Sequence, residues 1–168
     1  MTLATSLLPE LDNESATTRK LLETIPAAKA GWRPHPKSWS LGDLSVHIAN
    51  LPSWMSITLA QTELDLAPPG GPVFTPPKFE SPAATVRFFD ANVAKARAAL
   101  AAASDAELLV PWTLKNGGVA QFTLPRLAVL RSFVLNHLIH HRGQLTVYLR
   151  LCDVPLPSVY GPTADMPG

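Results

Sequence analysis

Apolar residues recur with helical spacing in four stretches of the chain, and proline-rich segments separate these stretches. Positions three and four apart lie on one face of a helix, so each stretch predicts a helix with one apolar face. With their capping residues, the predicted helices cover residues 7–24, 40–61, 81–103 and 123–153. Such helices bury their apolar faces against one another, which predicts an all-α fold, a four-helix bundle.

Serine and proline residues mark where the predicted helices begin and break. Ser40 and Ser81 stand where an N-cap is needed, and Pro82 follows at the first helical position, where a missing N–H does no harm. Pro9 is expected in the first turn of the first helix for the same reason. Pro52 lies inside the second helix, where proline removes a backbone hydrogen bond, so a kink or a break is predicted there.

The connecting segments are rich in proline and glycine. The first linker carries Trp32 and Trp39, which are expected to plug one end of the bundle. Residues 62–77 predict a long crossover loop, which a bundle needs when two consecutive helices are not antiparallel neighbours. Residues 109–123 predict a short β-hairpin before the last helix, since strand-like runs flank Asn-Gly-Gly. Residues 154–162 contain too many prolines for a helix and are expected to lie along the surface as a tail.

Composition argues against several classes of partner. The 168 residues fit a single domain, 1–168, and a net charge of +1 without a lysine or arginine block argues against nucleic acid. The single cysteine, Cys152, excludes an internal disulfide and has no cationic neighbour to make its thiol reactive. No apolar run approaches the ~20 residues of a membrane span, and the N-terminus lacks the basic flank of a signal peptide. We therefore expect no membrane partner and a cytoplasmic location.

Histidines on the last predicted helix are the strongest chemical signal in the chain. His137 and His141 are four residues apart on the apolar face, with Leu130 and Leu145 at the same spacing. A buried imidazole is costly unless its nitrogens find partners, and a metal ion would use both rings at once. His140 could pair with His137 instead, since residues three apart also meet, but the apolar stripe continues on the His141 side.

A third histidine would complete a metal site. His47 lies at the inward edge of the second predicted helix, and sites with an open coordination position usually have three protein ligands. His47, His137 and His141 would then leave room for water or substrate. The alternative is that these histidines are core residues bonded to carbonyl groups or water, with no metal. His35, between two prolines, is expected to be exposed and without a role.

Two motifs resemble the DinB-like (damage-inducible) family. They are Trp-Ser-x-x-Asp-Leu-x-x-His-Ile at residues 39–48 and Asn-His-x-x-His-His-Arg-Gly-Gln-Leu at residues 136–145, and the segment 151–165 resembles the ending of one branch. The resemblance implies a four-helix bundle with a long crossover, often a homodimer, and a divalent metal on three histidines. Those ligands correspond to His47, His137 and His141, and His140 is not among them.

The same resemblance implies an activity. Relatives of known activity are similar to S-transferases and isomerases that use low-molecular-weight thiols, so we expect a metal-dependent transferase or hydrolase-like enzyme acting on a small-molecule substrate. Zinc or nickel is the favoured ion, although three nitrogens also suit copper and iron. The alternative is a non-catalytic metal-holding module for stress response or ligand binding. No acid or base residue is assigned.

Other residues near the motifs have weaker expectations. Trp54 is expected in the core rather than in a pocket, and Tyr160 is expected to be a packing residue. Arg142 and Gln144 are within reach of the metal ligands or of a dimer partner. For Arg142, a position facing solvent or an interface is favoured.

Overall fold

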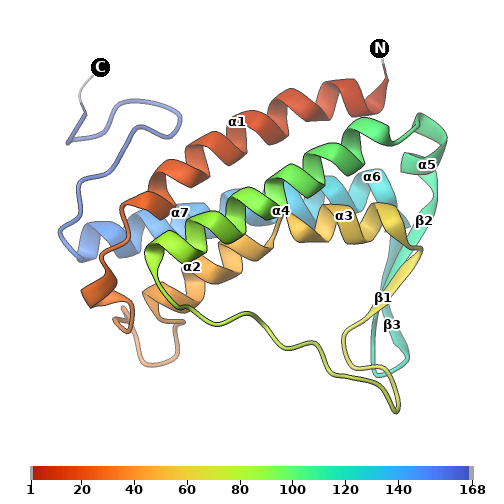
Figure 1. Ribbon diagram of the computed structural model, residues 1–168, viewed down its shortest axis with the longest axis horizontal. Helices are drawn as coiled ribbons and strands as arrows, with labels where there is room; N and C mark the ends of the chain where they lie inside the picture. Colours follow the sequence, from red (N-terminus) through yellow and green to blue (C-terminus); the bar gives the residue numbers. More distant parts are fainter. Residues whose placement is uncertain (1, 167–168) are drawn as a thin grey trace.

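The computed structural model describes residues 2–166, which are predominantly helical with a small sheet at one end (Figure 1). The long helices lie lengthwise beside one another: α1 packs on α4, α4 also contacts α2 and α3, and α7 packs on α2. The helical elements are α1 (Leu3–Glu23), a 3-10 turn (Ala27–Lys29), α2 (Leu41–Asn50), α3 (Ser53–Ala60), α4 (Pro82–Ala102), α5 (Asp105–Leu109), α6 (Arg126–Val129), a π-helical turn (Leu130–Leu135) and α7 (Asn136–Leu151).

Two of the long helices start at their predicted caps, and the other two start elsewhere. The hydroxyl of Ser40 accepts the backbone N–H of Asp43, and that of Ser81 accepts the N–H of Ala84, so both predicted N-caps are confirmed. Helix α1 begins four residues earlier than predicted because Thr2 caps it. Pro9 therefore lies inside α1, and its predicted place in the first turn is wrong.

The second predicted helix is interrupted at Pro52, as expected. Helix α2 ends at Asn50 and α3 begins at Ser53, because proline has no N–H to continue the ladder of helical hydrogen bonds. Just before the break, the N–H of Leu51 is still shared between the carbonyls of His47 and Ile48. The break thus comes one turn after His47 and leaves that residue on regular helix.

A three-stranded sheet contains the predicted hairpin and one strand that was not predicted. The strands are β1 (Glu63–Asp65), β2 (Pro111–Asn116) and β3 (Val119–Pro125), with β2 between the other two. Strand β1 comes from the crossover loop and runs parallel to β2. The Asp65 carboxylate accepts the N–H groups of Gly117 and Gly118, at 3.0 and 2.7 Å, in the hairpin turn. The long loop is therefore fixed to the hairpin at this point.

The last predicted helix starts later than expected and contains a wider turn. Pro125 still pairs with Pro111 in the sheet, so the helix begins at Arg126 and the predicted cap at Thr123 is wrong. Within it, the N–H of Asn136 reaches the carbonyl of Arg131, five residues back. Such π-turns are rare and often occur at functional sites. This one ends immediately before the histidine-bearing helix α7.

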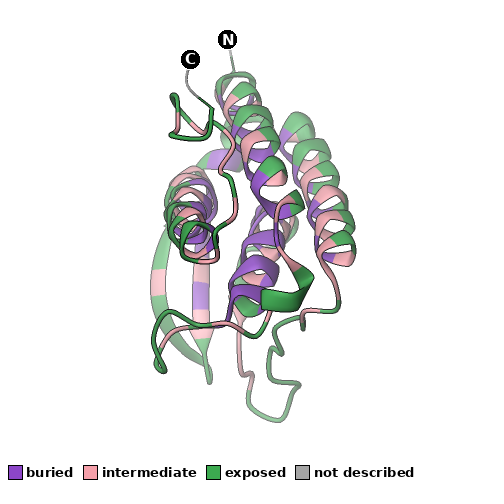
Figure 2. Cartoon of the chain, turned by 90° about the vertical axis from the view of Figure 1, so that its left-hand side faces the viewer, coloured by how far each residue is buried: buried purple, intermediate pink, exposed green. Residues whose placement is uncertain are grey.

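Buried residues line the sides of the helices that face one another (Figure 2). The tail after α7 is not helical and runs along the surface, as predicted, with Val154, Leu156 and Val159 packed on the core. An ion pair between Arg150 and Asp165, with 2.5 Å between Nη2 and Oδ2, ties the tail to α7. None of the helices within residues 2–166 is long and apolar enough to span a membrane.

Candidate metal centre

Three histidine side chains from two helices meet in the space between α2 and α7. The Nε2 atoms of His47 and His137 are 3.4 Å apart, and those of His137 and His141 are 2.8 Å apart. One ligand atom from each of the three rings lies within 4.8 Å of the others. Two nitrogens bound to one tetrahedral zinc, with bonds of about 2.0–2.1 Å, are separated by about 3.3 Å. The His47–His137 distance matches this value and the His137–His141 distance is shorter, so the three rings are close enough together for one small ion to lie between them.

His140 lies outside this cluster. Its side chain is exposed on α7, whereas His141 is only 8% exposed. Within residues 2–166, only one group of three or more His, Cys, Asp or Glu side chains is close enough together to hold a metal ion. It consists of His47, His137 and His141. The structure therefore brings together the three histidines that the sequence predicted and leaves their neighbour aside.

Gln144 fixes the orientation of the His141 ring. The Nδ1–H of His141 donates to Gln144 Oε1 at 2.7 Å, so the ring proton is at Nδ1 and the Nε2 lone pair faces the other two imidazoles. The amide nitrogen of Gln144 in turn donates to His140 Nε2 at 3.2 Å. The expectation that Gln144 reaches the ligand residues is confirmed.

The electrostatic environment keeps the three rings neutral. Burial, with a smaller contribution from the nearby His141 and His137, lowers the pKa of His47 to about 4. Burial also lowers the pKa of His137, against a hydrogen bond to the Phe133 backbone that raises it. For His141, burial again lowers the pKa, and the bond to Gln144 opposes this effect. At neutral pH all three histidines are in the form that binds metals.

Trp39 forms one wall of the cluster. Its ring lies edge-on to His47, with 4.7 Å between centroids, and stacks on His141 at 5.5 Å with the planes 24° apart. Trp39, which was expected to plug the bundle end, is thus a half-exposed wall of the cluster rather than a buried plug. Trp32 packs against Tyr148. One sequence signal could have found Trp39. It directly precedes the Ser40 cap, and the residue before an N-cap commonly packs back on the first turns of its helix.

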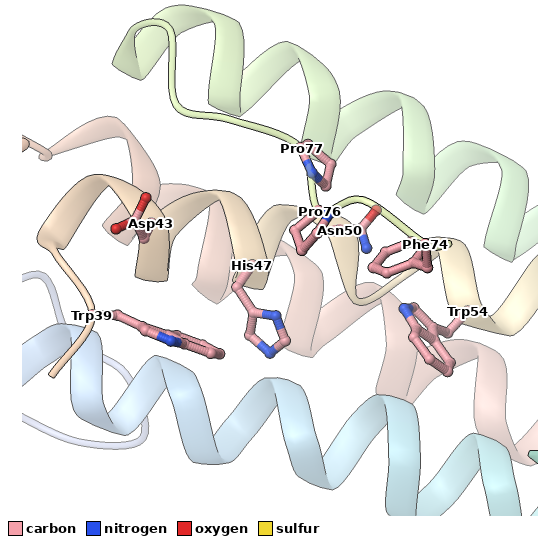
Figure 3. Close-up of a pocket in the computed structure, with 8 residues that line it drawn as sticks. All are labelled: Trp39, Asp43, His47, Asn50, Trp54, Phe74, Pro76 and Pro77. Atoms are coloured by element: carbon pink, nitrogen blue, oxygen red, sulfur yellow. The ribbon is translucent and has the colours of Figure 1, made fainter. Parts of the chain in front are cut away.

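A cavity of about 320 Å³ opens beside His47 (Figure 3). Helix α2 and the residue before its cap provide one side, and Trp54 of α3 lies opposite Trp39. The expected core position of Trp54 is thus only half right, because this side chain packs on the core and also lines the cavity. The crossover loop provides the remaining side, which the sequence did not predict. The lining residues are Trp39, Asp43, His47, Asn50, Trp54, Phe74, Pro76 and Pro77.

Arg142 was expected to face solvent or an interface, and that expectation is wrong. The side chain is buried on the other side of α7, where it forms an ion pair with Glu14 of α1, with 2.6 Å between Nη2 and Oε2. The hydroxyl of Tyr160 accepts from Arg142 at 2.5 Å and donates to Glu14 at 2.9 Å. Tyr160 is therefore more than a packing residue, because it links the tail to this pair.

Cys152 fits the expectation that its thiol is unreactive, since burial raises the pKa of that thiol.

Comparisons with known proteins agree with this architecture. Residues 10–145 match the DinB superfamily. A DinB-like protein from Bacillus cereus ATCC 10987 is 22% identical, with a TM-score of 0.71 over 95% of this chain and 98% of that chain. A DinB-like protein from Bacillus subtilis is 19% identical, with a TM-score of 0.69 over 92% and 96% of the two chains. At these identities the likeness establishes the fold alone. A search of curated proteins gave no match. The match over most of its length shows that the chain belongs to the DinB superfamily.

Proposed function

We propose that this DinB superfamily member is a metal-dependent enzyme of the thiol S-transferase type, with a divalent transition metal held by His47, His137 and His141. The observation that carries the proposal is the arrangement of the ring nitrogens. Since Gln144 holds the His141 proton at Nδ1, the Nε2 of that ring offers only a lone pair. Hydrogen bonds between neutral rings can satisfy only one of the two close contacts that His137 makes. A cation between the rings would satisfy all three lone pairs.

The donor set favours a transition metal. Imidazole nitrogens suit zinc, nickel, copper and iron, whereas magnesium and calcium prefer oxygen. We propose zinc or nickel as the resident ion. When bound, such an ion lowers the pKa of a thiol or water at its open position and so supplies a nucleophile near neutral pH.

The other residues of the chain position the metal ligands and shield the cluster from water. We propose that the helical stretches α1, α2–α3, α4 and α6–α7 act as a four-helix bundle that holds the ligand residues in place. Gln144 orients His141, and the half-exposed Trp39 screens the edge of the cluster from water. The cavity beside His47 gives a small-molecule substrate access to the site. The homodimer and the low-molecular-weight thiol implied by the resemblance stay predictions.

Metal content is the first test. Protein purified without an affinity tag should carry about one zinc or nickel ion per chain by elemental analysis, and the metal-free protein should bind zinc in calorimetric titration. His137→Ala and His141→Ala should lose the ion, whereas His140→Ala, one residue from a ligand but outside the cluster, should keep it. A wild-type protein that takes up no ion at neutral pH would leave the histidines as ordinary core residues.

Turnover is the second test. The zinc-loaded protein is incubated with a panel of low-molecular-weight thiols and an electrophile, and the loss of free thiol is followed over time. We expect thiol consumption above the uncatalysed rate that disappears in His137→Ala. Tight metal binding without consumption of any thiol would instead support the alternative, a metal-holding module with no turnover.

A further inference from the structure

The cavity beside His47 has aromatic walls. Figure 3 shows the His47 ring between Trp39 on one side and Trp54 on the other, with Phe74 of the crossover loop beside Trp54. The rings of Trp54 and Phe74 are 6.4 Å apart and inclined by 69°, an edge-to-face arrangement. Aromatic faces thus surround the space next to the histidine cluster.

Two of these aromatic side chains remain in contact with water. Trp39 is 47% exposed and Phe74 is 43% exposed, whereas Trp112 and Phe89, which have packing roles, are 0% and 1% exposed. Large apolar surface left at the mouth of a cavity typically marks a binding site, because a ligand can cover it. The half-exposed rings therefore point to an apolar or aromatic ligand.

The polar residues of the lining limit the charge and shape of that ligand. Asp43 is the charged residue of the lining; its carboxylate accepts from the Ser40 hydroxyl at 2.6 Å and lies 3.8 Å from the Arg33 guanidinium. The lining holds no lysine or arginine that could bind an anion. The Oδ1 atom of Asn50 accepts from Ser53, which leaves the Asn50 amide N–H groups for an acceptor on the ligand. The site thus suits a neutral ring that carries a hydrogen-bond acceptor.

We propose, building on the proposed function, that this cavity binds the electrophilic substrate and selects a flat, uncharged aromatic ring. The ring would lie between Trp39, Trp54 and Phe74, with its reacting carbon toward His47. The volume of about 320 Å³ is at the lower end of the range for small-molecule sites, which favours a single substituted ring.

A simple reaction of this class is aromatic substitution by a thiol. The sulfur forms a bond to the ring carbon that bears a chloride, the carbon–chlorine bond breaks, and chloride leaves with the electron pair. The thiol proton passes to buffer. Nothing is oxidised or reduced, and the co-reactants are one low-molecular-weight thiol and one activated aryl chloride.

Binding is tested with 1,3-dinitrobenzene, which has the ring and the acceptors but no leaving group. Equilibrium dialysis against the metal-free and the zinc-loaded protein should show saturable binding to both. Phe74→Ala should weaken binding about five- to ten-fold, the value of one aromatic pair. Val73→Ala is the matched control, since Val73 is exposed in the same loop and does not line the cavity. It should leave binding unchanged.

Two further probes test selectivity. Nitrocyclohexane removes flatness and 3,5-dinitrobenzoate adds a negative charge, so both should bind more weakly than 1,3-dinitrobenzene. Equal binding of all three probes, or a Phe74→Ala protein that binds like wild type, would overturn the proposal.

The outcome is separable from that of the metal proposal. His137→Ala should lose zinc yet still bind 1,3-dinitrobenzene, because residue 137 does not line the cavity. In turnover with 1-chloro-2,4-dinitrobenzene and a thiol, Phe74→Ala should raise KM at unchanged zinc content. Ring binding without zinc binding would contradict only the metal proposal. Zinc binding without ring binding would contradict only the proposal that the cavity selects an aromatic ring.

Discussion

Two adjacent residues of α7, His141 and Arg142, are both buried, and their surroundings differ in one respect. Arg142 finds its partners inside the protein: the Glu14 carboxylate and carbonyl, the Thr18 hydroxyl and the Tyr160 hydroxyl. His141 meets two other imidazoles whose nitrogens cannot all be paired within the cluster. A buried polar group with a complete set of partners holds the fold together, whereas an incomplete set is suited to an external ligand. On one helix, Arg142 thus has a structural role, and His141 has the unpaired nitrogen that the proposed metal site needs.

The largest expected effect on stability comes from removing the buried Arg142 side chain from its partners. Arg142→Ala leaves the Glu14 carboxylate buried without its cation, which should lower the free energy of unfolding by about 3–5 kcal/mol in urea titrations. Arg97→Ala is the matched control, because its ion pair with Asp12 is about half exposed and should contribute only about 0–1 kcal/mol. Equal losses in the two variants would show that the buried pair has no special weight.

Binding of zinc to the three histidines should raise the free energy of unfolding instead of lowering it. Zinc at a hundred times its dissociation constant should raise the free energy of unfolding of the wild-type protein by about 2.7 kcal/mol. His47→Ala, which lacks one ligand, should gain much less. The shift is measured as a change in the urea midpoint with and without zinc. If the variant is stabilised as much as the wild type, the ion binds elsewhere.

The role of Gln144 is expected to appear in zinc affinity rather than in folding. Gln144→Ala frees the His141 ring to rotate or to change tautomer and should weaken zinc binding about 10–100-fold. Gln144→Glu keeps an acceptor for the Nδ1 proton and should restore most of the affinity. Calorimetric titration of the metal-free proteins measures both values. If the alanine and glutamate variants bind zinc equally, the hydrogen bond does not position the ligand.

Lowering the pH should destabilise the folded protein through the histidine cluster. The pKa of His47 is about 4 in the folded protein and near 6.5 in the unfolded chain. Between these values the unfolded state binds more protons, so the stability that is fully present above pH 6.5 is lost as the pH falls toward 4. Bound metal should be released over the same range, because protons compete for the imidazoles. A stability profile of His47→Ala that falls as steeply as that of the wild type would exclude this origin.

Features that repeat with a regular period, or that depend on near neighbours in the chain, could be predicted from the sequence. The spacing of apolar residues gave the approximate extents of the long helices, and the spacing of His137 and His141 placed both on the inner face of the last one. The caps at Ser40 and Ser81 could also be predicted, since a cap is a local interaction.

The remaining features depend on contacts between distant segments. The short β1 has no alternation to reveal it, and Phe74 sits in a loop without periodicity. Arg142 looked solvent-facing because a buried arginine needs a partner, and Glu14 lies 128 residues away in the sequence. The π-turn leaves the apolar pattern almost intact, so only the backbone hydrogen bonds disclose it.

The attachment of the crossover loop to the hairpin has a consequence for how ligand preference could change. The N–H of Phe74 donates to the Leu66 carbonyl, and the N–H of Leu66 donates to Lys115 in β2. Phe74, one aromatic wall of the cavity, is thereby attached to the sheet and not to the helices that carry the histidines. Lengthening or shortening the Gly117–Gly118 turn would move this wall and leave the imidazoles in place. The proposed ligand selection and the proposed metal chemistry therefore depend on separate parts of the fold.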